Sequence, residues 1–144
     1  RNIVLSLIGV VPNFIAAFFI LGIIGLLGIP LDMMTITIAA ITIGIAVDNS
    51  IHYIYRFKEE FKKIQNYDKT LDRCHSTVGI AILNTSITIV FGFSILVLSN
   101  FIPTIYFGVF TGIAMLLAMI SVLTLLPKLI LTFKPFGKEI NEIL

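Results

Sequence analysis

Four long apolar runs dominate the sequence, and each exceeds the roughly 20 residues that a helix needs to cross a bilayer. We expect transmembrane helices at about 4–28, 33–57, 77–98 and 104–133, and we expect the second helix to continue past the membrane to about Ile64. Only 12% of the residues are charged, which is about half of the share in a typical soluble domain. The sequence therefore predicts an all-α fold, a polytopic membrane bundle with four transmembrane helices, and argues against a soluble protein.

Breaks between the runs carry Gly and Pro. "GIPLD" (28–32) and "SNFIP" (99–103) are expected to be tight turns. A third break, Pro12-Asn13, lies inside the first run and is expected to mark a change from a lead-in segment to the span proper. The chain begins with Arg1 and shows no signal-peptide pattern, so we expect it to be a piece of a longer protein.

Basic residues are confined to three places along the chain. They are Arg1 before the first run, a cluster between 56 and 73, and Lys128, Lys134 and Lys138 at the end of the last run. Neither of the two short turns contains one. Because positive charge stays on the cytoplasmic side, we expect both termini and the loop 58–76 in the cytoplasm, and a multi-pass location in the cell's inner (cytoplasmic) membrane.

One acidic residue, Asp48, lies inside a predicted span, whereas the other seven fall in turns, the loop or the tail. Arg56 follows eight positions later, so the helix rise places Asp48 about 12 Å below the cytoplasmic boundary. An ionisable group at such a depth costs at least about 2.5–3.5 kcal/mol on insertion scales and commonly marks an ion or proton pathway. Asp48 is therefore the main functional candidate.

Polar neighbours support a proton relay at Asp48. His52 follows at i+4 on the same helical face, with Asn49 beside it. The third run offers Thr85 and Thr88 on one face, and we expect their hydroxyls to orient the carboxylate across a helix pair. We expect Gly44 and Gly92 to let helices pack closely. Asp48 would then alternate between protonated and ionised forms and change the preferred helix packing.

Other interpretations of these residues stay open. Asp48 can be a structural contact between helices, His52 can lie at headgroup level, and the two threonines can bond their own helix. An intramembrane hydrolase built on Ser86 or Ser94 is compatible with the spacing.

Catalytic and metal-binding patterns find little support. "DNSIH" lacks the second His and the Glu of a metalloprotease helix, and no second buried carboxylate is available for an aspartyl pair. The single Cys74, next to His75, lacks further metal ligands. We therefore expect no enzyme, no cofactor and no metal, but a secondary active transporter.

Three strings carry a family resemblance: "LLGIPLDMMT…ITIGIAVDNSIHYIYRFKEEF", "NTSITIVFGFSILVLSNF" and "FGVFTGIAMLLAMISVLTLLPKLIL". They resemble the membrane region of resistance-nodulation-division (RND) superfamily exporters, in particular the MMPL-like branch. In that family each half holds six helices and an extracytoplasmic domain, so residues 1–144 correspond to the last four helices of one half. The form Asp-x-x-x-His suggests the C-terminal half.

The resemblance implies proton-motive-force-driven export of hydrophobic or lipid-like molecules, with Asp48 as the relay carboxylate. Asn49 stands where the family often has a second Asp, and Val122 stands where it has another. Implied partners are protons, the substrate, membrane lipids and the remaining half of the transporter, with no nucleic acid; a homo-oligomer is left open. The alternatives are a sterol-sensing-like domain that binds lipid without transport and a purely structural scaffold.

Overall fold

The computed structural model describes residues 3–137, and no strand occurs in this part of the chain. Its elements are α1 (Ile3–Leu26), α2 (Met33–Ile64), α3 (Tyr67–Cys74), the π-helix η1 (His75–Gly79), α4 (Ile80–Ser94), the 3-10 helix η2 (Ile95–Leu98) and α5 (Ile102–Phe133). Four helical stretches are long and apolar enough to cross a membrane: α1, α2, the continuous run Tyr67–Leu98, and α5. The predicted all-α membrane bundle is confirmed.

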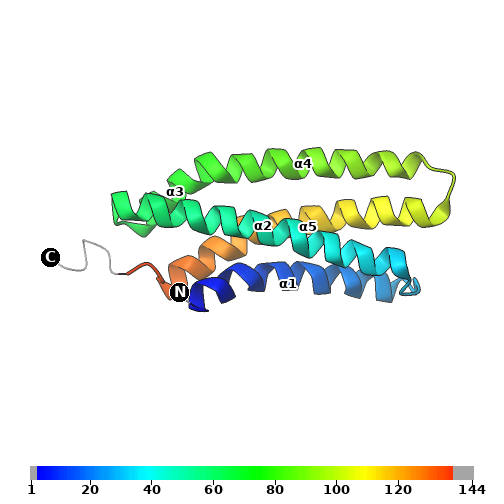
Figure 1. Cartoon of the computed structure of the whole chain (residues 1–144), viewed down its shortest axis with the longest axis horizontal. Helices are drawn as coiled ribbons and strands as arrows, with labels where there is room; N and C mark the ends of the chain where they lie inside the picture. Colours follow the sequence, from blue (N-terminus) through cyan, green and yellow to red (C-terminus); the bar gives the residue numbers. More distant parts are fainter. Residues whose placement is uncertain (1–2, 138–144) are drawn as a thin grey trace.

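The four long helices alternate in direction (Figure 1). The start of α1, the junction of α2 with α3, and the end of α5 lie at one end of the bundle, while the two short turns lie at the other. α1, α2 and α5 pack against one another, and α4 packs chiefly against α5. α5 is therefore the common neighbour of the other three helices, and α4 stands to the side of the three-helix core.

α2 begins at Met33 and ends at Ile64, as expected, and a local cap defines each end. Asp32 accepts a hydrogen bond from the Thr35 amide at 2.9 Å, and Thr35 Oγ1 accepts one from the Asp32 amide at 2.9 Å. This reciprocal capping box fixes the first turn. The helix ends at Ile64, where Gln65 adopts a left-handed conformation with φ 51°.

In the segment 58–76, the expected continuation of helix to about Ile64 is confirmed, whereas the helical structure that resumes at Tyr67 was not predicted. Gln65 and Asn66 form the turn, and helix continues on both sides. Asn66 caps α3 by accepting a hydrogen bond from the Lys69 amide at 3.0 Å. The two helix ends share an aromatic cluster of Phe57, Phe61, Tyr67 and Phe136, and this packing stabilises helix in a polar stretch.

Pro12-Asn13 lies inside a continuous α1, as the expected helix over about 4–28 requires. Pro12 is buried in α1. The helix continues through it because a proline removes only one amide donor, while the flanking turns remain bonded. Asn13 is fully buried, and its Nδ2 donates to Gly9 O at 2.8 Å and to Ser50 Oγ at 3.0 Å. The pair thus marks the contact of α1 with α2.

Close helix packing depends on different glycines from those predicted. A Cβ added to Gly44 or Gly92 would meet nothing within 4 Å, so neither glycine packs against a described helix. A Cβ on Gly108 would lie 2.7 Å from Phe93 O and 2.8 Å from Leu96 Cβ. Gly108 therefore lets α5 approach the end of α4.

This difference predicts opposite effects of the same substitution at two helical glycines. We expect Gly108→Ala to lower the stability by about 1–3 kcal/mol, because backbone atoms must shift to admit the methyl group. Gly92→Ala is the matched control and should be neutral or slightly stabilising, since it gains helix propensity without a clash. Thermal unfolding in detergent measures both, and equal effects would contradict this packing of α4 on α5.

Candidate functional site

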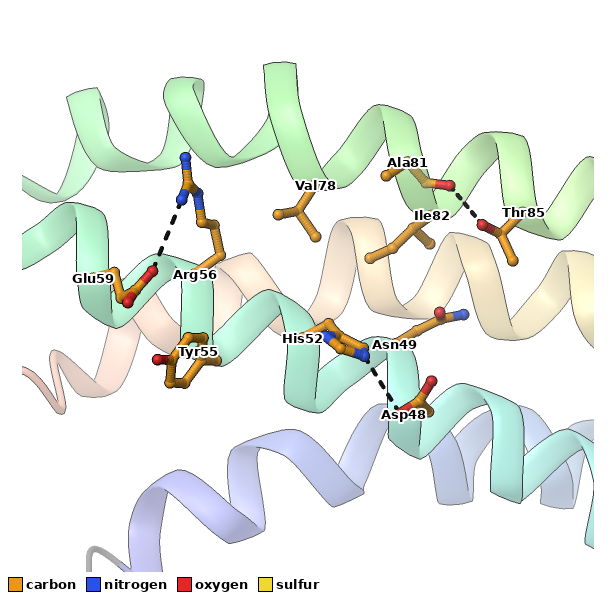
Figure 2. Close-up of a pocket in the computed structure, with 10 residues that line it drawn as sticks. All are labelled: Asp48, Asn49, His52, Tyr55, Arg56, Glu59, Val78, Ala81, Ile82 and Thr85. Carbon is orange, nitrogen blue, oxygen red and sulfur yellow. Dashed lines mark hydrogen bonds and ion pairs between the residues drawn. The ribbon is translucent and has the colours of Figure 1, made fainter.

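A groove of about 500 Å³ separates α2 from η1 and α4 (Figure 2). The α2 side of the groove is polar, and the facing side is apolar apart from one threonine. The lining residues are Asp48, Asn49, His52, Tyr55, Arg56 and Glu59 from α2, and Val78, Ala81, Ile82 and Thr85 from η1 and α4. The predicted relay candidates Asp48, Asn49 and His52 thus meet in one hollow.

Asp48 and His52 form the pair that their spacing predicts. His52 Nε2 lies 3.6 Å from Asp48 Oδ1, one turn apart on α2. This distance is within reach of an ion pair but longer than a good hydrogen bond. Both side chains are 71% exposed, so they face out of the bundle that residues 3–137 form and not into its interior, which is where an intramembrane acid is expected to face.

The two threonines of α4 do not bond the Asp48 carboxylate. Thr85 lines the groove, but its hydroxyl donates to Ala81 O at 2.9 Å (Figure 2). Thr88 does not line the groove, and its hydroxyl donates to Asn84 O at 2.9 Å. A threonine in an apolar helix readily bonds the carbonyl four residues earlier, and α4 packs along α5 and not along α2. The expected contact across the helix pair was therefore wrong.

The hydrolase and metal alternatives gain no geometric support in the described residues. Ser94 donates its hydroxyl to Val90 O at 2.7 Å, and Ser50 is bonded to Asn13 in the core. No serine partner of either histidine occurs among the hydrogen bonds of residues 3–137. The same range holds no group of three His, Cys, Asp or Glu side chains that could bind a metal ion.

A buried carboxylate at the end of the groove was missed by the sequence analysis. Glu60 is only 3% exposed, and its oxygens lie 3.1 Å from Arg56 Nη2, 3.4 Å from Arg73 Nε and 3.7 Å from Lys63 Nζ. The i,i+4 spacing of Arg56 and Glu60 was a visible signal, but Arg73 joins them only through the turn at 65–66. The cluster ties α3 to α2.

Two further polar groups link the helices and were not predicted. Tyr53 is fully buried on α2, and its hydroxyl lies 3.2 Å from His75 Nδ1. His75 Nε2 lies 3.1 Å from Leu123 O on α5. No spacing rule in the sequence connects positions 53, 75 and 123, so only the folded chain brings them together.

The Glu60 cluster predicts a sharp difference between neighbouring glutamates. We expect Glu60→Gln to lower the stability by about 1–3 kcal/mol, because three cations lose their shared carboxylate. Glu59→Gln should change it by less than about 0.5 kcal/mol, since Glu59 is half exposed and pairs only with Arg56 at 3.8 Å. Thermal unfolding at low ionic strength measures both, and equal losses would contradict the central role of Glu60.

A family model and two related proteins show what this chain is similar to. The family model described as "MMPL family" matches residues 2–140. A protein of Methanocaldococcus jannaschii that is named as a membrane protein is 36% identical over 125 residues, which cover 87% of this chain and 32% of the relative. The hopanoid transporter HpnN of Burkholderia multivorans is 29% identical over 114 residues, which cover 76% of this chain and 12% of the relative.

The chain thus spans only about a third of the length of one relative and about an eighth of the other. No solved structure matches it significantly. The match to the family model covers nearly the whole sequence, including both helices that line the groove. With four membrane-spanning helices and this match, the chain belongs to the MMPL family of multi-pass membrane proteins, within the RND superfamily.

Proposed function

We propose that this chain is the membrane part of a proton-motive-force-driven RND-type exporter of hydrophobic or lipid-like molecules, and not an enzyme. The observation that carries the proposal is the pair of Asp48 and His52, 3.6 Å apart at the groove between α2 and α4. A carboxylate and an imidazole in contact can exchange a proton. Membership of the MMPL family and a relative named as a hopanoid transporter support a lipid-like substrate.

In this mechanism Asp48 takes up the proton and His52, one turn nearer the cytoplasm, passes it on. Asn49 lines the same groove and can donate to or accept from a water molecule, although it cannot carry a proton as a second carboxylate would. Thr85 faces the groove from the other side, where a change of rotamer would turn its hydroxyl from Ala81 O. Thr88 has no place in this relay because it lies outside the groove.

The remaining parts of the transporter belong to the proposal. The exposed Asp48 face would be completed by the other half of the protein, and residues 1–144 would supply the last four helices of a six-helix half. Substrate, protons, membrane lipids and that second half are then its partners. The C-terminal half, and any assembly of copies, stay predictions from the sequence.

We propose that the protein lies in the inner membrane of the cell, with the α2–α3 junction and both ends of the chain on the cytoplasmic side. The basic residues of the described part, Arg56, Lys58, Lys62, Lys63, Lys69, Arg73, Lys128 and Lys134, lie near the end of the bundle where α2 meets α3 and α5 ends (Figure 1). Arg1 and Lys138 lie outside the described residues. This clustering agrees with the positive-inside rule.

The second candidate is a sterol-sensing-like domain that binds lipid without moving it. One feature of the groove favours this function: the wall that faces α2 is apolar, and an acyl chain or a ring system could contact it. This wall consists of Val78 from η1 and Ala81 and Ile82 from α4. Proton coupling separates the two functions, since a binding domain does not need the charge of Asp48.

Neutralising Asp48 tests the proton relay. In the full-length protein reconstituted into liposomes, we expect Asp48→Asn to abolish lipid movement driven by an imposed proton gradient, because the amide cannot take up a proton. Asp32→Asn is the control: it also removes one carboxylate, but an asparagine still caps α2. Gradient-driven movement that survives Asp48→Asn would rule out this relay. If the unmodified protein binds lipid but moves none under the gradient, the sensing function is favoured.

Single cysteines test the proposed orientation. In a Cys74→Ala background of the full-length protein, we expect Lys62→Cys to react with a membrane-impermeant thiol reagent only after cells are opened. Asn100→Cys, at the opposite end of the bundle, should react in intact cells. The reverse pattern of labelling would contradict the proposed orientation.

A further inference from the structure

Pro127 leaves a carbonyl of α5 without its helical donor. In an α-helix the amide of residue i donates to the carbonyl of residue i−4, so the acceptor of position 127 is Leu123 O. Proline has no amide hydrogen, and its ring also pushes that carbonyl away from the helix. Within an apolar span such a carbonyl needs a donor from elsewhere in the protein.

His75 supplies that donor. Its Nε2 lies 3.1 Å from Leu123 O, and a carbonyl oxygen can only accept a hydrogen bond. Nε2 must therefore carry a hydrogen, because an unprotonated Nε2 would set two lone pairs against each other. The orphaned carbonyl of α5 thus determines the tautomer of a histidine that lies 48 residues earlier in the chain.

The other ring nitrogen then serves Tyr53. Tyr53 is fully buried, and the described residues offer its hydroxyl no other hydrogen-bond partner than His75 Nδ1, at 3.2 Å. In the neutral Nε2–H tautomer, Nδ1 accepts a hydrogen bond from this hydroxyl. Leu71 O also lies 3.3 Å from Nδ1, the longest of the three His75 ring contacts. The assignment of Nδ1 as an acceptor therefore depends on Tyr53, whose hydroxyl has no other acceptor among the described residues, whereas Leu71 O already accepts the backbone amide of His75. One neutral imidazole satisfies both Tyr53 and Leu123.

The place of His75 in the chain gives this bridge a consequence for the groove. His75 begins η1, a π-helical turn of the kind that often occurs at functional sites. Val78, three residues later, is the first residue of the groove wall that faces α2, and α4 continues that wall. Tyr53 is the neighbour of His52 on α2. The bridge therefore joins both walls of the groove to the proline turn of α5.

We propose that His75 is a positioning residue: its neutral Nε2–H tautomer bridges Tyr53 and the carbonyl freed by Pro127, and thereby holds the α4 wall of the groove opposite Asp48 and His52. The functional meaning of this wall rests on the proposed function, whereas the bridge itself does not. His75 does not carry the transported proton in this scheme. It sets the separation of α2 and α4 at the point where they flank the relay pair.

Nitrogen NMR of the unmodified full-length protein tests the tautomer directly. With ¹⁵N-labelled histidine, the His75 signals, identified by their loss in His75→Gln, should show a protonated Nε2 and an unprotonated Nδ1 at neutral pH. Tyr53→Phe should shift the Nδ1 signal and leave Nε2 protonated. An unprotonated Nε2, or an Nδ1 signal indifferent to Tyr53→Phe, would overturn the proposal. The first of these results is read in the unmodified protein, and His75→Gln serves only to assign the signals.

A double-mutant comparison tests the link to Pro127. We expect His75→Ala to lower the Tm by several degrees, and by clearly less in a Pro127→Ala background, because the alanine introduced there has a backbone amide that donates to Leu123 O. His75→Gln should retain most of the Tm, since its amide can donate in place of Nε2–H. Ser76→Ala, in the same π-helical turn and exposed, is the control and should change nothing. Additive effects of His75→Ala and Pro127→Ala would contradict the bridge.

Spin labels report the positioning itself. Labels at Tyr55→Cys and Ala81→Cys, on opposite walls of the groove, should give one narrow distance distribution in the full-length protein, a broader one with His75→Ala, and recovery with His75→Gln. An unchanged distribution in His75→Ala would overturn the positioning role. These measurements need no transport, so a failure of the proton relay at Asp48 would be recognised separately.

Discussion

Hydrocarbon offers no hydrogen-bond partners, and this constraint decides where most polar side chains of the bundle point. Hydroxyls on the spans donate to the carbonyl four residues earlier in their own helix, as seen at Thr37, Thr42, Thr85, Thr88 and Thr124. Asn13 and Ser50 satisfy each other between α1 and α2. His75 Nε2 bonds Leu123 O, the carbonyl that Pro127 leaves without a helical donor. Polar groups that find partners on another helix thus become the points at which helices are joined.

Asp48 and His52 depart from this pattern, because they contact each other but remain largely exposed on α2. Their exposure follows from the place of α4. α4 packs against α5, with a close contact at Gly108, and the groove lies between α4 and α2. Asp48 and His52 are therefore accessible because α4 does not cover this face of α2. In the proposed transporter, water in the groove or the other half of the protein would complete the site.

The positions of the helices and the main acid could be predicted from the sequence, and several partners could not. Run length and composition were sufficient for the four spans, and i,i+4 spacing was sufficient for Asp48 and His52, since both depend on neighbours along one helix. Thr88, Gly44 and Gly92 were assigned to helix contacts that the described residues do not make. Those assignments assumed that α2 packs along α4. The hydrophobic periodicity of a single helix does not show which other helix of the bundle lies beside it.

By itself the sequence determined the all-α membrane class, the family, and the contact of an acid with an imidazole one turn away, because hydrophobic length, motif and helix pitch are local properties. Only the tertiary structure decided that Glu60 is buried among Arg56, Lys63 and Arg73, that Tyr53 and Leu123 meet at His75, and that the Asp48 face looks outward. The physical reason is that each of these depends on how α3, α4 and α5 pack against α2 and against one another. That packing joins residues far apart in the sequence, which no pattern along a single helix reveals.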